Sequence, residues 1–142
     1  MQPPKKQCEE LMTTLLPFAE MMLRDHGEFH PFGGVVDSAG TIHLLGAWSC
    51  GERRCSADII KQLRIGMIRD AGTRQIIAAA ILYDVRVVPP KQTAPTDAIA
   101  VDVDHQTGLS QTVVYPYRIQ GPQLVVGKCY CIKNQHPVFQ QH

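Results

Sequence analysis

The first clear pattern in the chain is helical. Apolar residues recur at three- and four-residue steps before residue 27, as one buried face of a helix requires. Their main positions are Leu11, Leu15, Phe18 and Met22. Pro17 lies inside this pattern, and because proline has no amide hydrogen and crowds the preceding turn, we predict a helix from about Glu9 that bends there. Gly27 follows, the residue type that most often ends a helix in a left-handed conformation.

After Phe32 the spacing of apolar residues changes from helical to strand-like. Val35 and Val36 lead into the turn-forming residues 37–40, and residues 41–45 follow, which together predict a β-hairpin. A second helix is predicted from Ser56, a typical helix-capping residue, to Gly72.

Four further strand-like runs complete the chain. They are Gln75–Val88, Ala98–His105, Leu109–Ile119 and Leu124–Ile132. The first run is apolar on both faces, which predicts a central strand. In the second run, apolar residues alternate with Asp102 and Asp104, so we expect one face to be buried and the other to meet water.

This order of elements predicts a single α+β domain over residues 1–142, with loose termini at residues 1–7 and 134–142. We expect a mostly antiparallel sheet of about five to six strands, with the helices packed on one face. The order resembles that of roadblock-like and profilin-like domains. That resemblance implies a binding or dimerising module and assigns no activity.

Composition and charge exclude some classes of partner. The 142 residues are 44% hydrophobic and 19% charged, and a net charge of +1 gives no electrostatic argument for nucleic acid or an anionic membrane. Glu20, Arg24 and Asp25 interrupt the first apolar segment, so we expect neither a signal peptide nor a membrane span. Five cysteines, an odd number without an export signal, indicate free thiols in the reducing cytoplasm.

The stretch HGEFHPF is the first candidate site. His26, Glu28 and His30 carry side chains that suit a divalent metal ion. The alternative is architectural: Gly27 ends the helix, nearby phenylalanines enter the core, and Gly33–Gly34 lets the chain join the sheet closely. We favour the architectural interpretation, because glycine and proline in this stretch predict a sharp turn rather than an extended set of ligands.

The cysteines offer a second metal hypothesis. Cys50 and Cys55 with Cys129 and Cys131 would make a four-thiolate zinc site. Four residues separate the first pair, more than is usual in a zinc knuckle with its short turn. The second pair is a Cys-x-Cys within a strand, whose thiols would lie about 7 Å apart. We therefore expect these cysteines to be small apolar residues in or near the core.

Residues just before the second helix could bind an anion or activate a thiol. Arg53 and Arg54 stand beside a helix N-terminus, a favourable place for negative charge. The same surroundings would make Cys55 the most reactive thiol among the candidate nucleophiles Cys8, Cys50 and Cys55. No local catalytic signature supports a nucleophile.

A wider resemblance covers about residues 11–120. The runs HGEFHPFGGVVDSAGTIHLL, DAIAVDVDHQTG and YPYRI resemble those of a group of small uncharacterised bacterial proteins that share an HGEF-PFG turn. The resemblance implies a compact intracellular domain, carries no known activity and transfers no functional residue.

We therefore predict a non-enzymatic cytoplasmic binding or interaction domain without a cofactor. It would form a homodimer, or bind a protein partner, through a sheet edge or its helical face. The alternative is a small metal-binding protein or metal-dependent enzyme that uses His26, Glu28 and His30, or Cys50 and Cys55. An immunity or antitoxin-like partner is a third interpretation.

Overall fold

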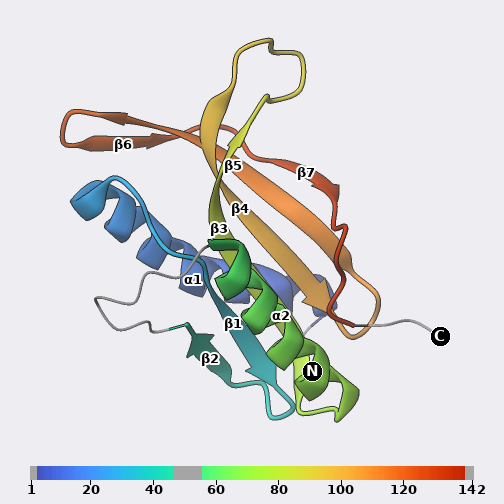
Figure 1. The fold of residues 1–142 in the computed structure, drawn as a ribbon. Coiled ribbons are helices and arrows are strands. Elements are labelled where there is room, and N and C mark those ends of the chain that lie inside the picture. The colour runs from blue at the N-terminus through green and yellow to red at the C-terminus, as the bar shows by residue number, and fades with distance from the viewer. Residues whose placement is uncertain (1–2, 47–55, 140–142) are drawn as a thin grey trace.

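The computed structural model describes residues 3–46 and 56–139 of the chain (Figure 1). Their elements are, in order, α1 (Pro4–His26), β1 (Phe32–Asp37), β2 (Ile42–Leu45), α2 (Ser56–Gly72), β3 (Ile76–Val87), β4 (Thr96–His105), β5 (Ser110–Gln120), β6 (Gln123–Val126) and β7 (Tyr130–Lys133). The predicted α+β class is confirmed. Within these ranges no helix is both long enough and apolar enough to cross a membrane.

The strands form one antiparallel sheet in the order β2-β1-β3-β4-β5-β6. β3 is central, as predicted, and pairs with β1 on one side and β4 on the other. The outer side of β5 is shared, because β7 pairs with Gln111–Val114 and β6 pairs with Tyr117–Gln120. The last predicted strand is therefore two separate strands in the structure.

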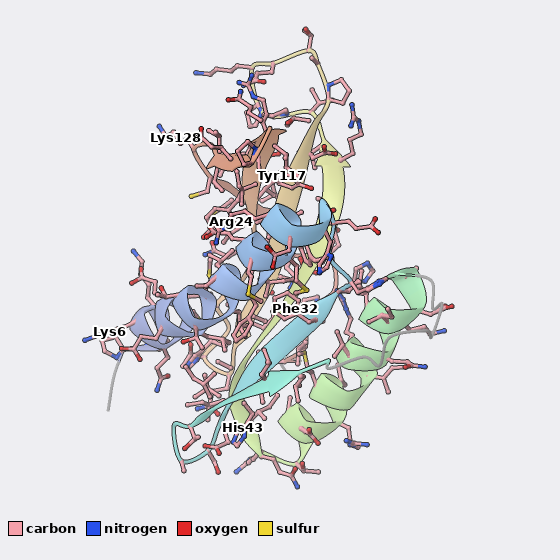
Figure 2. The ribbon with its side chains drawn as sticks, turned by 90° about the vertical axis from the view of Figure 1, so that its left-hand side faces the viewer. Lys6, Arg24, Phe32, His43, Tyr117 and Lys128 are labelled. Atoms are coloured by element: carbon pink, nitrogen blue, oxygen red, sulfur yellow. The ribbon has the colours of Figure 1, made fainter. Side chains whose placement is uncertain are left out.

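The two helices lie on opposite faces of the sheet, which corrects the expectation that both pack on one face. Ala78, Ala80 and Leu82 of β3 join the core cluster under α1. Ala79 and Ile81, which point the other way along the same strand, join the cluster under α2. Figure 2 shows the sheet between the two helices. A strand that is apolar on both faces needs a layer on each side to be buried, and two helices supply those layers.

Helix α1 begins earlier than the apolar pattern predicts. Pro4 occupies its first turn, where the missing amide hydrogen costs nothing, and the helix continues uninterrupted through the exposed Pro17. The ring of His105 fixes the start, since its Nε2 lies 2.7 Å from Oε1 of Gln7. Residues 4–7 are thus helical, in contrast to the loose N-terminus that we expected.

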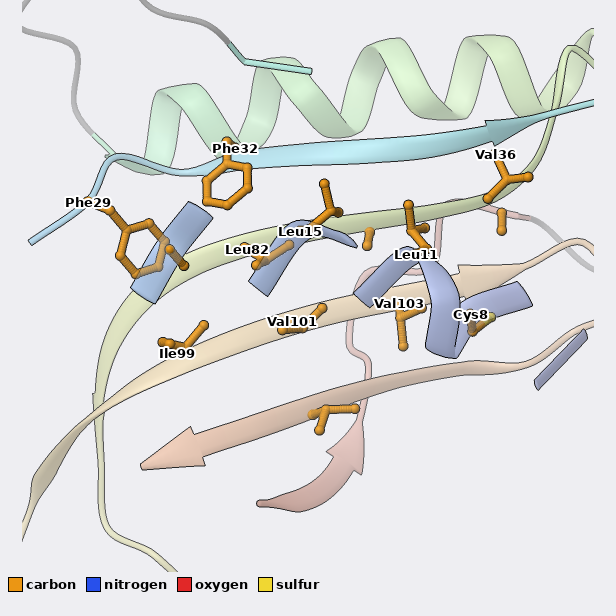
Figure 3. Packing of buried hydrophobic residues seen from close by; sticks show 14 of the residues in the cluster. Cys8, Leu11, Leu15, Phe29, Phe32, Val36, Leu82, Ile99, Val101 and Val103 are labelled. Carbon is orange, nitrogen blue, oxygen red and sulfur yellow. The ribbon is translucent and has the colours of Figure 1, made fainter. Parts of the chain in front are cut away.

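The helical period indicated the buried face of α1 only in part, because Phe18 is exposed and Met22 is half-buried. Leu11, Leu15, Ala19 and Leu23 are fully buried against the sheet (Figure 3). Adjacent Gly33 and Gly34 allow β1 to pass closely between the two helices. A Cβ atom at Gly33 would lie 2.5 Å from the Ala80 carbonyl oxygen, and one at Gly34 would lie 2.9 Å from the Leu15 methyl carbons. Only glycine fits this close approach without a shift of its neighbours.

Candidate functional site

The HGEFHPF stretch has the architectural role that the sequence favoured. Gly27 adopts a left-handed conformation with φ of 76°, and its N–H donates to the Leu23 carbonyl oxygen at 2.9 Å. Phe29 and Phe32 are buried in the α1 core, with ring centroids 5.9 Å apart in an edge-to-face arrangement (Figure 3). The two aromatic rings hold this turn against the sheet.

The polar residues of the same stretch point to solvent. His26, Glu28 and His30 are all exposed. Over residues 3–46 and 56–139, no group of three or more histidine, cysteine, aspartate or glutamate side chains is arranged to hold a metal ion. These three residues therefore do not form a ligand set in the structure.

The cysteines divide into buried and exposed thiols. Cys8 is buried, and burial raises the pKa of its thiol to about 11, so it stays protonated at neutral pH and is a poor nucleophile. Cys129 and Cys131 are exposed and free. The expectation of core cysteines is wrong for this pair, because β7 pairs only along one side of β5 and nothing in the described chain covers it. Cys50, Cys55, Arg53 and Arg54 lie outside the described residues.

Asp102 is buried on the α2 side of the sheet, where we expected water. Its side chain accepts hydrogen bonds from three other elements, and the residue is 5% exposed. Arg64 of α2 donates through Nη2 at 2.9 Å, the Tyr83 hydroxyl at 3.0 Å and the Thr112 hydroxyl at 2.6 Å. The paired charge and the hydrogen bonds offset the desolvation of the carboxylate, so Asp102 ties α2 to the sheet.

Asp104 makes an equivalent link to the end of the chain. Its carboxylate accepts hydrogen bonds from the Ser110 hydroxyl, from Asn134 Nδ2 at 3.1 Å and from the Val138 N–H at 3.4 Å. Burial raises the pKa of Asp104, and the hydrogen bonds from Ser110 and Val138 act against this shift. Asn134 and Val138 are buried, so the chain is held in place up to residue 139, in contrast to the loose C-terminus that we expected. Both aspartates serve the fold, and their acceptor oxygens are occupied by the protein.

The outer edge of β2 offers unpaired backbone groups. The Asp37 N–H donates to the Thr41 carbonyl oxygen at 2.9 Å, so Asp37 and Thr41 are the first hydrogen-bonded pair of the β1–β2 ladder. Bonded pairs alternate with non-bonded pairs in an antiparallel ladder. The register pairs Ile42 with Val36 and Leu44 with Gly34, so both pairs are non-bonded. The N–H and C=O groups of Ile42 and Leu44 therefore point away from β1, and no other strand of the described chain pairs with them.

An apolar groove of about 250 Å³ lies beside this edge. Its lining residues are Phe18, Met22, His30, Phe32, Leu44, Leu45 and Gly46. Leu44 is 51% exposed and Phe18 is 40% exposed, values unusual for large apolar side chains that neighbour each other. We call the β2 edge together with this groove the β2 surface. His30 is the sequence-predicted site residue that lies on it.

The β1–β2 hairpin that presents this surface is held by Asp37. Its carboxylate accepts hydrogen bonds from the backbone N–H groups of Ala39 and Thr41, both at 2.9 Å, and lies 2.7 Å from His43 Nε2. The hydrogen bond with His43, followed by that from Thr41, lowers the pKa of Asp37. An ionised Asp37 therefore fixes both the turn and the orientation of His43 on the edge strand.

Comparison with known proteins adds no assignment. No family model matches the chain, and neither a curated protein nor a solved structure matches it.

Proposed function

We propose that this protein is a non-enzymatic interaction domain that forms a homodimer by pairing the β2 edges of two copies. The observation that carries the proposal is the pair of outward backbone groups at Ile42 and Leu44, next to an exposed apolar groove. An unpaired edge strand is a template for a further strand, and a second copy of the same edge is the self-complementary choice.

The positions of the outward groups select one register. If Ile42 pairs with Leu44 of the second copy, two-fold symmetry repeats the pair and forms four hydrogen bonds. Other two-fold registers would require Gly40 or Gly46 to take part. Their φ angles of 90° and 99° are not extended, so those registers form fewer bonds. In the favoured register the two copies of His43 lie opposite each other as a non-bonded pair.

The same symmetry covers the apolar groove. A two-fold axis perpendicular to the sheet joins two antiparallel edges and keeps corresponding faces on the same side. The side chain of Leu44 is on the α1 face, since its partner Gly34 approaches Leu15. Leu44 of one copy then lies across from Ile42 of the other, between the two α1 helices. Burying exposed apolar side chains of this size supplies the main favourable free energy of association.

Two further observations support a non-enzymatic interaction domain and a cytoplasmic location. Asp102 and Asp104 are buried titratable side chains, and their oxygens already accept hydrogen bonds from Arg64, Ser110 and other protein groups. That arrangement fits structural support better than proton transfer. The free thiols of Cys8, Cys129 and Cys131 are in keeping with function in the reducing cytoplasm.

A disulfide cross-link tests the register directly. In the proposed dimer the two Cα atoms of residue 43 lie about 4.5 Å apart, within the range that a disulfide spans. We expect His43→Cys, in a background with Cys129→Ser and Cys131→Ser, to give a cross-linked dimer on mild oxidation. Mass spectrometry of the digested dimer should identify a link between two copies of residue 43.

Thr41→Cys in the same background is the matched control. In the proposed register the two copies of residue 41 are offset by four residues, about 13 Å along the strand, which is too far for a disulfide. Equal cross-linking of both variants, or a monomer at all concentrations in analytical ultracentrifugation, would contradict the proposal.

A further inference from the structure

A second surface lies at the other end of the molecule from the β1–β2 hairpin. It is a groove of about 720 Å³ between the β3–β4 connection and the outer strands that follow Pro116. Figure 2 shows Lys128 and Tyr117 at this end, remote from His43. We call it the basic groove, after the side chains Lys91, Arg118 and Lys128 that line it. The groove is separate from the β2 surface, so an inference about it does not depend on dimer formation.

The charge of the basic groove has one sign. No aspartate or glutamate lines it, and none of its three cations forms an ion pair with another residue of the described chain. The whole protein carries a net charge of only +1, so this concentration of positive charge is local. Cations that share one concave surface repel each other and attract anions. A ligand with two or three negative charges would neutralise them.

The walls of the basic groove are held in shape by the backbone. The Gln92 N–H donates to the Pro89 carbonyl oxygen at 3.1 Å, and the Gly127 N–H donates to the Pro116 carbonyl oxygen at 2.7 Å. Lys91 adopts a left-handed conformation with φ of 64°, which is uncommon for a residue with a side chain. A groove that is already formed needs little ordering when a ligand binds.

The rest of the lining combines the aromatic rings of Tyr117 and Tyr130 and apolar residues with uncharged polar ones such as Gln92 and Thr96. Tyr130 is half-buried, and Val125 and Pro116 lie on the same face of the outer strands as Arg118. The hydroxyl of Tyr117 already donates to Asp84 Oδ1 at 2.7 Å, so the three cations, which are the charged side chains of the lining, are the strongest groups available to bind an anion. A tyrosine ring beside unpaired cations suits a ligand with a flat ring and an anionic group.

Size and charge together restrict the ligand. A volume of about 720 Å³ lies within the range of about 300–1,000 Å³ for small-molecule sites. A long nucleic acid would require basic side chains well beyond three, and the net charge of +1 does not provide them. We propose that the basic groove binds a small phosphorylated organic anion with a flat ring, of the nucleotide class.

Calorimetric titration of the full chain with ADP tests the proposal at low ionic strength. We expect saturable binding at one site per chain, and at least tenfold weaker binding of adenosine, which lacks the phosphates. The double variant Arg118→Gln and Lys128→Gln should weaken ADP binding at least tenfold. The single variant Lys91→Gln should do the same. Lys61→Gln is the matched control, because Lys61 is an exposed lysine on α2 and does not line the groove.

Several outcomes would overturn the proposal. These are the absence of ADP binding at millimolar concentration, equal loss of affinity in Lys61→Gln, or adenosine binding as tightly as ADP. Inorganic pyrophosphate that binds as well as ADP would remove the role of the flat ring and refute the nucleotide class. A hexaglutamate peptide that binds where ADP does not would assign the groove to acidic peptides instead. If each variant unfolds at the same temperature as the parent protein, its loss of affinity is local to the groove.

Discussion

Shortening Leu44 to alanine should weaken the proposed dimer by an amount that the structure allows us to work out. The Leu44 side chain is 51% exposed in one copy, so pairing would bury about half of it. Full burial of a leucine contributes about 1.5–3 kcal/mol, so the remaining half contributes about 1 kcal/mol. A dimer contains two copies of Leu44, for a total of about 2 kcal/mol. That free energy corresponds to an increase of about 30-fold in the dissociation constant.

Sedimentation equilibrium over a range of protein concentrations measures this change. Ile65→Ala is the control, because Ile65 is 57% exposed on α2 and does not line the apolar groove. We expect Ile65→Ala to leave the dissociation constant within about threefold of the parent value. If Leu44→Ala and Ile65→Ala change the dissociation constant equally, the contact does not involve the β2 edge, and the reasoning fails.

Three predictions concern the fold that presents these surfaces. Gly33→Ala should lower the free energy of unfolding by about 1–3 kcal/mol in urea denaturation, because its Cβ would meet the Ala80 carbonyl oxygen at 2.5 Å. Gly66→Ala, with open space around its Cβ, should be neutral or stabilising, and an equal loss there would refute the steric explanation. Arg64→Met should cost about 3–5 kcal/mol in the same assay, since it leaves the buried Asp102 without its counter-charge, and adding Asp102→Asn should restore part of that loss. Asp37→Asn should reduce thermal stability at pH 7. The pKa of Asp37 in the folded protein is below its usual value. The parent protein therefore has the extra stability at pH values above the usual pKa and loses it as the pH falls through the folded pKa. A stability difference that persists in acid would show that the charge of Asp37 is not its source.

The sequence predicted a helix or strand well where the spacing of apolar residues within that segment was sufficient to define it. The run Gln75–Val88 was apolar on both faces and became the central β3, and Ser56–Gly72 became α2 with the same bounds. The apolar character of both faces of β3 also contained the evidence for a helix on each side of the sheet. The expectation of one helical face followed from element order alone, which does not state on which side a connection crosses.

The polar residues of the sheet show where a local pattern is insufficient. Alternation of apolar residues with Asp102 and Asp104 is typical of a strand with one wet face, yet both aspartates are buried. Their partners come from distant parts of the chain, Arg64 and Asn134 among them, and no spacing rule connects such residues. The same limit applies to the start of α1, where Gln7 is fixed by His105, 98 residues away.

The β2 surface depends on topology in the same way. The sequence indicates that residues 41–45 form a strand, but only the strand order shows that β2 is at an edge and that β1 separates it from β3. Once β2 is an edge strand, the alternation of the ladder determines that Ile42 and Leu44 carry the outward groups. The register pairs Leu44 with Gly34, whose Cβ position faces Leu15, so the Leu44 side chain lies on the α1 face and lines a groove together with the exposed Phe18. Leu44 therefore carries both an exposed apolar side chain and outward backbone groups, and this combination makes the edge suitable for a second copy.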